Sequence, residues 1–343
     1  MADHTPTFAL VGSDSLLGRE IRDMATTSAA TPFSLRLIAA EEERSGTLTR
    51  FGDEVATVAE LTALSLAGAR GVFLAGRQES SRKALELLAD EPDTAIIDLT
   101  GTAEDTGDAR LRAPAVEAQA DEEEAPERPE ARVHVIAHPA AIALALFLRR
   151  LHAQDGIRRS VVQILAPASE HGVKGVEELQ QQTVSLLSFK PLPRAVFDGQ
   201  SAFNLLAQYG EEAPASLEET ELRIERHLAT LLNLPGAGGG APLPSLRVVQ
   251  APVFHGYSIS AWVEFENNSG REAIESGLAA AHIEVRGGEF EPPNNVGQAG
   301  QSGIAVGAIA EDRNDADAVW FWIVADNLRV SAENAMAVAR DLV

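Results

Sequence analysis

The stretch VHVIAHPAAIALALFLRR has the pattern of a buried strand, a turn and a helix, and an α/β enzyme would keep its nucleophile at such a turn. Here the turn at His138 and Pro139 is followed only by Ala140 and Ala141, which carry no reactive group. The 343-residue chain also has no cysteine, which excludes disulfides, thiolate metal sites and any thioester mechanism. The position expected to hold a nucleophile therefore holds none.

The charge and hydropathy of the chain exclude several classes of partner. Its formal net charge is −23, so it repels polyanions, and we expect it to bind neither nucleic acid nor anionic membrane. The sequence has no uncharged apolar run of roughly 18 residues, the length a membrane span needs. The first residues, which include Asp3, do not resemble a signal peptide. By elimination, we expect a cytoplasmic location.

The first third of the chain alternates strand and helix patterns. TFALVGSDSLLGREIRDMA passes from an apolar strand through a glycine-containing turn into a helix, with Leu17, Ile21 and Met24 at helical spacing. The segments FSLRLIAAEEE, ARGVFLAG and DTAIIDLTG predict further strands, with a helix over residues 80–88. This alternation favours a mostly parallel, doubly wound sheet. Residues 107–130 are acidic and rich in Ala and Pro, and we interpret them as a solvated, partly disordered excursion.

The second part of the chain contains more strands than helices. RRSVVQILAPAS, SLRVVQAPVF, YSISAWVEFE and AVWFWIVADN predict strands, and SLEETELRIERHLATLLN predicts a helix with Ser216 as its N-cap. The final segment, SAENAMAVARDLV, predicts a closing helix capped by Ser331. This composition is typical of an α+β domain. The length of the chain agrees with two domains of about 150 residues each.

The order of these segments resembles the aspartate-semialdehyde dehydrogenase family nearly end to end. The resemblance runs through LVGSDSLLGREI, AIIDLTG, IAHPAAIALALFLRRLHAQDGIRRSVVQ, ASEHGVKGVEELQQQT, APVFHGYSISAWVEFE and VADNLRVSAENAMAVA. It implies a Rossmann-like NAD(P)-binding domain over residues 1–134, completed by residues 326–343. It also implies an inserted α+β dimerisation domain over residues 135–325. Members of the family oxidise or form a semialdehyde with NADP, through a cysteine thioester and a phosphate site.

Matched residue by residue, the resemblance implies that the catalytic side chains are replaced. Ala141 stands at the family's cysteine, Ala166 at the glutamine that orients it, and Tyr257 at the acid/base histidine. Gln250 stands at the arginine expected to bind the substrate carboxylate, whereas Glu225 matches the substrate-binding glutamate. No thioester route is expected for such a set of residues.

Phosphate recognition is expected to fail for the same kind of reason. Glu104 stands at the family's arginine after the IID strand, and Glu221 stands at the lysine of the EETELRIE helix. Phosphate sites depend on charge-assisted donors. Two exchanges of a cation for an anion therefore make phosphate a poor ligand.

Nucleotide binding is expected to be weakened. Ser15 replaces the middle glycine of the family's Gly-x-x-Gly-x-x-Gly turn, and Ala40 replaces the serine that meets the 2′-phosphate. The run Glu41 to Glu43 opposes that phosphate, so NADP should bind no better than NAD. Gly12 and Gly18 either preserve dinucleotide binding or simply permit a tight turn. The resemblance assigns these nucleotide contacts: Gly12, Ser15, Leu16, Leu17, Gly18, Ala40, Gly76 and Asn327.

Three histidines add a second possibility. In the resembled fold His138, His171 and His255 fall in loops around the former catalytic centre, near Glu170 and Tyr257. Imidazoles and a carboxylate could form a metal or an acid/base site. The plainer interpretation is a partly wet cleft without a metal.

Two classes of function follow. The first is a catalytically silent relative of the dehydrogenases that acts as a dimeric binding or interaction protein. It would be a homodimer, or a heterodimer with an active paralogue. The second is an active NAD(P)-dependent oxidoreductase of amino-acid biosynthesis with altered, histidine-centred chemistry. An assay of NADP reduction with aspartate semialdehyde and phosphate separates the two.

Overall fold

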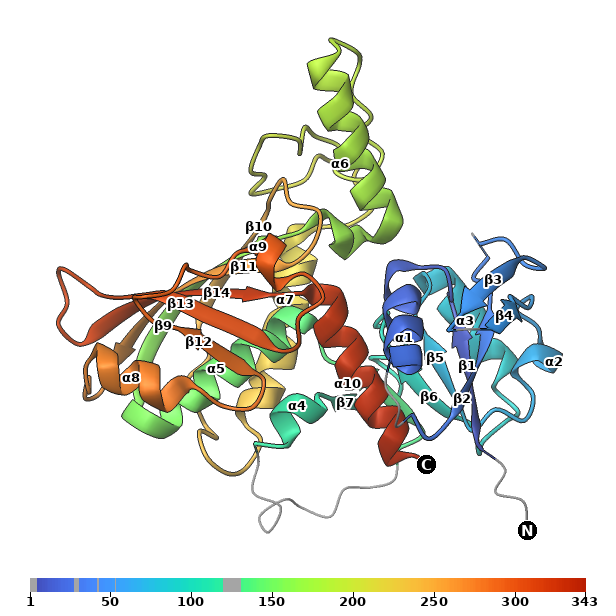
Figure 1. Cartoon of the computed structure of the whole chain (residues 1–343), viewed down its shortest axis with the longest axis horizontal. Coiled ribbons are helices and arrows are strands. Elements are labelled where there is room, and N and C mark those ends of the chain that lie inside the picture. The colour runs from blue at the N-terminus through green and yellow to red at the C-terminus, as the bar shows by residue number, and fades with distance from the viewer. Residues whose placement is uncertain (1–4, 28–30, 42, 53, 120–130) are drawn as a thin grey trace. The chain divides into compact units, whose positions relative to one another are not determined.

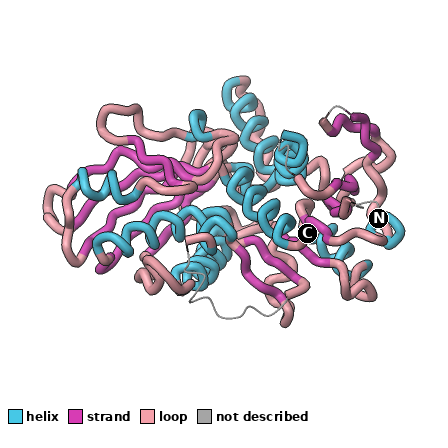
Figure 2. Tube along the Cα trace, turned by 60° about the horizontal axis from the view of Figure 1, so that its bottom comes forward, coloured by secondary structure: helices cyan, strands magenta, loops and turns pink. Residues whose placement is uncertain are grey.

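The computed structural model describes the whole chain except residues 1–4, 28–30, 42, 53 and 120–130. The chain divides into two compact units, each built on one six-stranded sheet (Figures 1 and 2). Unit 1 comprises Met1–Pro114, Glu127–Ala137 and Ser331–Val343, and unit 2 comprises Ala115–Pro126 and His138–Val330.

Unit 1 contains a fully parallel sheet with strand order β2-β1-β5-β6-β8-β7. Its strands are β1 (Thr7–Val11), β2 (Ser34–Ile38), β5 (Gly71–Leu74), β6 (Ala95–Asp98), β7 (Ala109–Arg112) and β8 (Val133–Ile136). A hairpin of β3 (Leu48–Phe51) and β4 (Glu54–Thr57) stands apart from this sheet. The doubly wound, Rossmann-like fold class expected from the alternating pattern is confirmed.

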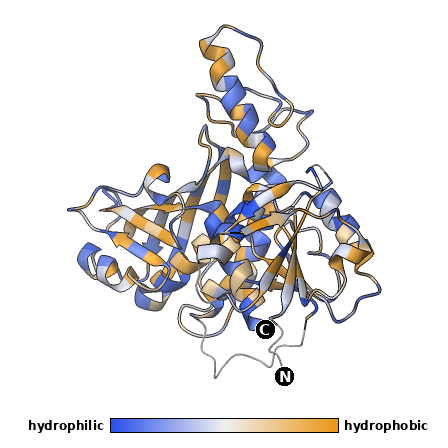
Figure 3. Ribbon diagram, turned by 45° about the vertical axis from the view of Figure 1, so that its right-hand side comes forward, coloured by the Kyte–Doolittle hydropathy of each residue, from blue (hydrophilic) through white to orange (hydrophobic). Residues whose placement is uncertain are grey.

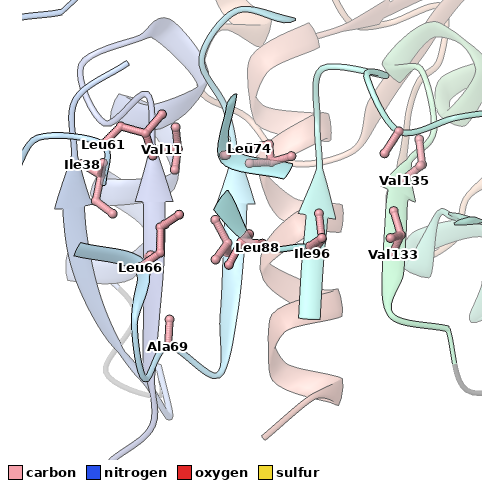
Figure 4. Close-up of a cluster of buried hydrophobic side chains, with 14 residues drawn as sticks. Val11, Ile38, Leu61, Leu66, Ala69, Leu74, Leu88, Ile96, Val133 and Val135 are labelled. Carbon is pink, nitrogen blue, oxygen red and sulfur yellow. The ribbon is translucent and has the colours of Figure 1, made fainter. Parts of the chain in front are cut away.

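The core of unit 1 explains why these short runs form strands. β1, β5 and β6 consist mainly of fully buried apolar residues, as expected for parallel strands that are covered on both faces. Figure 4 shows their side chains in one cluster with those of β2 and β8, where Val11, Leu74 and Ile96 lie on neighbouring strands. Burial of this cluster positions the turns that follow each strand.

In the described part of unit 1, the helices α1 (Leu16–Thr27), α2 (Ala63–Leu66) and α3 (Gln78–Leu87) accompany the parallel sheet. Two further helices pass from one unit to the other along the chain: α4 (Pro114–Glu117) and α10 (Asn327–Asp341). The C-terminal part of α10 belongs to unit 1. There the Asp341 carboxylate pairs with Arg112 at 2.9 Å, and the Leu342 carbonyl accepts a hydrogen bond from Arg70 at 3.0 Å. The closing helix thus returns to the first sheet.

Two expectations about this unit need correction. The acidic stretch 107–130 is not a loop throughout, because Ala109–Arg112 adds β7 to the sheet edge beside β8. Pairing with β8 satisfies the β7 backbone, which outweighs the polar composition. The acidic centre of that stretch lies outside the described residues. Ser331 does not cap α10, because the helix begins at Asn327 and the Asp326 carboxylate accepts from the backbone N–H groups of Leu328 and Arg329.

Unit 2 contains a mixed sheet with strand order β10-β9-β11-β14-β13-β12. Its strands are β9 (Ile157–Ala166), β10 (Ser245–Gln250), β11 (Tyr257–Phe265), β12 (Ile283–Arg286), β13 (Ile304–Glu311) and β14 (Ala318–Ala325). β11 runs antiparallel to both β9 and β14. The sequence patterns had identified four of these strands; β12 and β13 were missed because they are short or lie among glycine-rich segments.

Its helices are α5 (Pro139–Asp155), the 3-10 turn η1 (Ala168–His171), α6 (Gly172–Leu187), α7 (Leu217–Leu232), α8 (Arg271–Leu278) and α9 (Asn295–Gln298). Ser216 caps α7 as expected, because its hydroxyl accepts from the Glu218 N–H. α6 extends away from the mixed sheet, and Figure 3 shows polar and apolar residues alternating along it. In the described part of the chain, no helix is long and apolar enough to cross a membrane.

Candidate functional site

The candidate site in unit 2 includes the N-terminus of α5. His138 is the N-cap and Pro139 occupies the first helical position, where its lack of an N–H costs nothing. The His138 Nδ1 accepts from the Ala140 N–H at 3.3 Å, and the His138 N–H donates to Nδ1 of His227 at 2.9 Å. Ala141, which the family resemblance places at the nucleophile, is a fully buried methyl group.

Glu170 of η1 joins His138 to Tyr257 of β11. Its Oε1 lies 3.1 Å from His138 Nε2, and its Oε2 accepts from the Tyr257 hydroxyl. Because His138 Nδ1 is an acceptor, Nε2 carries the proton that faces the carboxylate. The His138 side chain is 2% exposed, whereas that of Glu170 is 20% exposed. One carboxylate is therefore held by two buried donors.

This cluster shifts the ionisation of its members. Burial alone would raise the pKa of Glu170, but electrostatic attraction to His138, with hydrogen bonds from His138 and Tyr257 and the nearby His171, lowers it to about 2. Burial, followed by the charge of Glu170, raises the pKa of Tyr257 well above its usual value, and Arg223 opposes that shift. Tyr257 thus stays protonated as a donor, and Glu170 stays ionised as an acceptor.

A second network involves His171, Tyr209 and Gln250. His171 Nε2 lies 2.8 Å from the Tyr209 hydroxyl, which donates to Gln250 Oε1 at 2.8 Å. The Gln250 amide donates in turn to the carbonyls of Ala166 and Ala251 at 3.0 and 2.9 Å. Burial lowers the pKa of His171. Gln250, which the family resemblance places at the carboxylate-binding arginine, is fully buried, and its side-chain amide is hydrogen-bonded within the chain.

The remaining positions of the predicted site serve mainly as internal contacts. Glu221 of α7 accepts from Arg247 and from the Val248 N–H at 2.8 and 2.7 Å, which ties α7 to β10. The Asn327 side-chain oxygen accepts from the Gly256 N–H at 3.0 Å and from Ser169 at 3.1 Å. Asn327 thereby holds η1 and the loop before β11 together. Glu225 is half-buried on α7.

Sequence reasoning missed three residues of this site. His227, Tyr209 and Arg223 come from α7 and the loop before it. The chain has only two tyrosines, and both lie in these hydrogen-bond networks. That scarcity was the one available signal for Tyr209.

The proposed metal trio is not assembled as a metal site. His138 and His171 belong to the two networks above, and Nδ1 of His255 is buried without a hydrogen-bond partner. Within the described residues there is no group of three or more His, Cys, Asp and Glu side chains arranged to hold a metal ion.

The predicted nucleotide turn lies in unit 1, between β1 and α1. Ser15 donates to the Ala75 carbonyl at 2.7 Å and accepts from the Gly18 N–H at 2.9 Å. A pyrophosphate would use amides of this kind at a helix N-terminus. Gly12 has a φ of +85°, and a Cβ there would lie 2.3 Å from the Gly76 nitrogen. A Cβ at Gly18 would lie 2.0 Å from the Gly12 carbonyl oxygen. The packing of the turn thus requires both glycines without any ligand.

The turn after β2 also uses its own side chains. The Ala40 N–H donates to the Glu43 carboxylate at 3.1 Å, and Glu41 pairs with Lys83 at 2.8 Å. The Glu43 carboxylate therefore already accepts the hydrogen bond of the Ala40 N–H, beside the place that the resemblance gives to the 2′-phosphate of NADP. Glu42, the middle residue of the acidic run, lies outside the described residues.

One face of the mixed sheet carries an aromatic row. Val161, Trp262 and Trp320 are directly opposite one another on β9, β11 and β14. Both tryptophan N–H groups donate to the Asp312 carboxylate, at 3.0 and 2.7 Å. Val161 is 53% and Trp320 44% exposed. An open hollow on this face is lined by Ser260, Pro292, Ala308, Trp320, Phe321 and Trp322.

Comparisons with known proteins agree with this architecture. Residues 148–330 match the family model described as semialdehyde dehydrogenase, dimerisation domain. A Pseudomonas aeruginosa protein named USG-1 protein homolog is 30% identical over 94% of this chain and 93% of its own length. An Aquifex aeolicus aspartate-semialdehyde dehydrogenase is 29% identical over 61% of this chain and 62% of its own.

Solved structures extend the similarity over the whole chain. A probable aspartate-semialdehyde dehydrogenase from Pseudomonas aeruginosa is 27% identical with a TM-score of 0.80, over 99% of this chain and 98% of the other. Aspartate semialdehyde dehydrogenase II from Vibrio cholerae shares the fold, with a TM-score of 0.81 at 23% identity over the same shares of the two chains.

Proposed function

Because the chain belongs to the aspartate-semialdehyde dehydrogenase family, we propose that it is a catalytically inactive member that acts as a dimeric binding or interaction protein. The observation that carries this proposal is the state of the former catalytic positions. Ala141 offers a buried methyl group in a chain without cysteine, and the Tyr257 hydroxyl donates its hydrogen bond to the chain's own Glu170. Such a site lacks a nucleophile and a titrating acid/base.

The residues present do not favour binding of the phosphate that the family's reaction uses. Glu221, at the family's lysine, is a carboxylate engaged with β10, and Gln250 brings no positive charge to a substrate carboxylate. Phosphate would meet an anion in place of a cation. The missing lysine would weaken phosphate binding and the missing arginine would weaken substrate binding, independently of the missing nucleophile.

The decisive experiment is NADP reduction by purified protein with aspartate semialdehyde and phosphate, with the Aquifex aeolicus enzyme as positive control. We expect no turnover above the protein-free rate, because no thioester can form. Turnover by the purified chain that disappears in Tyr257→Phe would overturn the proposal.

Nucleotide binding is proposed to be weakened rather than lost, with NAD bound at least as well as NADP. Ser15 already satisfies the Gly18 amide, and the Glu43 carboxylate lies at the Ala40 amide. Ser15 competes with a phosphate group for the Gly18 N–H, and the negative charge of Glu43 repels the 2′-phosphate.

We propose that the assembly is a homodimer formed through the aromatic row of the mixed sheet. Its exposed Trp320 and Val161 lie within the region that matches the dimerisation domain. The same face could equally receive an active paralogue, which would make a heterodimer. Co-purification of a second, similar chain from the source organism distinguishes these assemblies.

A second function is favoured by one observation. His138, the partly exposed Glu170 and Tyr257 are hydrogen-bonded in series, as acid/base groups often are. This arrangement would suit an NAD(P)-dependent oxidoreductase with histidine-centred chemistry. Activity lost in His138→Ala but insensitive to thiol reagents would favour it over the inactive relative.

A further inference from the structure

We propose that His138 and Tyr257 form a carboxylate-binding site that the chain closes with its own Glu170, and that a small free carboxylate takes this place when the Glu170 carboxylate is absent. The inference deepens the proposed function, because it assigns a ligand class to the site whose catalytic side chains are replaced. It rests on the geometry of unit 2 alone.

The arrangement of the donors identifies the ligand. His138 Nε2 faces one oxygen of the carboxylate and the Tyr257 hydroxyl faces the other. The donors come from different elements, the start of α5 and the start of β11. Two convergent donors, one for each oxygen, match a planar carboxylate.

The two donors are more deeply buried than the Glu170 side chain that they hold. The His138 and Tyr257 side chains are almost completely buried, whereas Glu170 stands on the short turn η1 and is partly exposed. Of these three side chains, Glu170 is therefore the one that reaches solvent. A ligand could enter there without disturbing either donor.

Both donors are held by contacts that do not involve Glu170. His138 is fixed by its N-cap bond from the Ala140 N–H and by the bond from its own N–H to His227. Tyr257 lies in β11, paired with Ala325 of β14. The donors should therefore keep their positions in a Glu170 variant, where they would lack a buried acceptor. Arg223 adds electrostatic attraction for an anion near this place, because its charge opposes the rise in the pKa of Tyr257.

The test uses full-length Glu170→Ala and Glu170→Gly, with Glu170→Gln as matched control. Thermal unfolding is measured at pH 7 in sodium acetate or sodium formate against sodium chloride of equal ionic strength. In the Ala and Gly variants we expect acetate and formate to raise the Tm in a saturable way. The wild type and Glu170→Gln should respond equally to all three salts, because a side chain still fills the site.

A further substitution locates the binding. Adding Tyr257→Phe to Glu170→Ala removes one of the two donors. The acetate affinity should then fall roughly tenfold or more, as expected for the loss of a hydrogen bond to a charged group. If only one of the two Glu170 variants folds, that variant carries the test.

Two results would overturn the site: an equal response of Glu170→Ala and Glu170→Gly to acetate and chloride, or a response of the wild type equal to theirs. Neither result bears on catalysis, which the NADP assay of the wild type decides separately. Conversely, turnover by the wild type would refute the inactive role and leave the acetate result intact.

Discussion

At the scale of single residues, Glu170 organises the hydrogen-bonded cluster of unit 2. Its carboxylate accepts from His138 and from Tyr257, the residue that the family resemblance places at the acid/base histidine. Its carboxylate thereby links the start of α5 to the start of β11. These buried hydrogen bonds are expected to contribute to the stability of unit 2.

This role predicts a defined pH dependence of stability. The folded pKa of Glu170, about 2, lies below its ordinary value of 4.5. The stabilisation is therefore complete above about pH 4.5 and is lost as the pH falls toward 2. Its size is about 3 kcal/mol in the free energy of unfolding. The titratable groups that face the Glu170 carboxylate are His138, which is the N-cap of α5, His171 of η1 and Tyr257 of β11.

Urea unfolding of wild type and Glu170→Gln between pH 3 and 7 tests this dependence. The difference in unfolding free energy between the two proteins should be large at pH 7 and shrink toward pH 3. The control is Glu177→Gln, at an exposed position of α6. A difference for Glu170→Gln that does not change with pH would show that the carboxylate charge is not what stabilises the fold.

At the scale of elements, the turn between β1 and α1 follows a Rossmann-like path. Its own Ser15 hydroxyl accepts the hydrogen bond of a backbone N–H at the start of α1. Gly12 and Gly18 are required by backbone contacts with Gly76 and with each other. Ser15 then uses the Gly18 amide. Glycines that match a nucleotide motif can therefore persist for reasons of packing alone.

Removing the Ser15 side chain should improve nucleotide binding. Ser15→Gly frees the Gly18 N–H and removes a Cβ, so the NAD affinity measured by calorimetry should rise roughly fivefold to tenfold, about one hydrogen bond in free energy. Ser15→Ala frees the same N–H but keeps the Cβ, and we expect a smaller gain.

In the wild type, NADP should bind no better than NAD, because Glu43 and Glu41 lie beside Ala40. Clearly tighter binding of NADP, or no gain in Ser15→Gly, would contradict the assignment of this turn.

At the scale of the whole molecule, the mixed sheet exposes Val161 and Trp320 on one face. Val161, Trp262 and Trp320 form a row across three strands of that face. Exposed apolar surface of this kind, on a chain with a net charge of −23, is typical of an interface.

Truncating this row should weaken self-association. Trp320→Ala removes a partly exposed aromatic residue and its bond to Asp312. The dimer dissociation constant from sedimentation velocity should rise about 30-fold, the effect of losing about 2 kcal/mol at an interface centre. Leu64→Ala, at an exposed position of α2 in unit 1, is the control. A wild type that sediments only as monomer at micromolar concentration would rule out the homodimer.

The sequence by itself determined the elements whose signals are local. The apolar runs of β1, β5 and β6 predicted buried parallel strands, and Ser216 predicted the start of α7. The lack of cysteine and the identity of Ala141 are likewise facts of sequence. Local periodicity and capping chemistry act over a few residues, so they can be read without the fold.

Only the tertiary structure decided which polar groups satisfy one another. Ser331 has the chemistry of a cap, but Asp326 begins the helix earlier, and β7 forms in an acidic stretch because β8 supplies its hydrogen bonds. The pairing of His138 with Glu170 and of Tyr209 with Gln250 joins residues more than 30 positions apart. Such partners depend on how the chain packs, because a buried donor takes whichever acceptor the fold brings within reach.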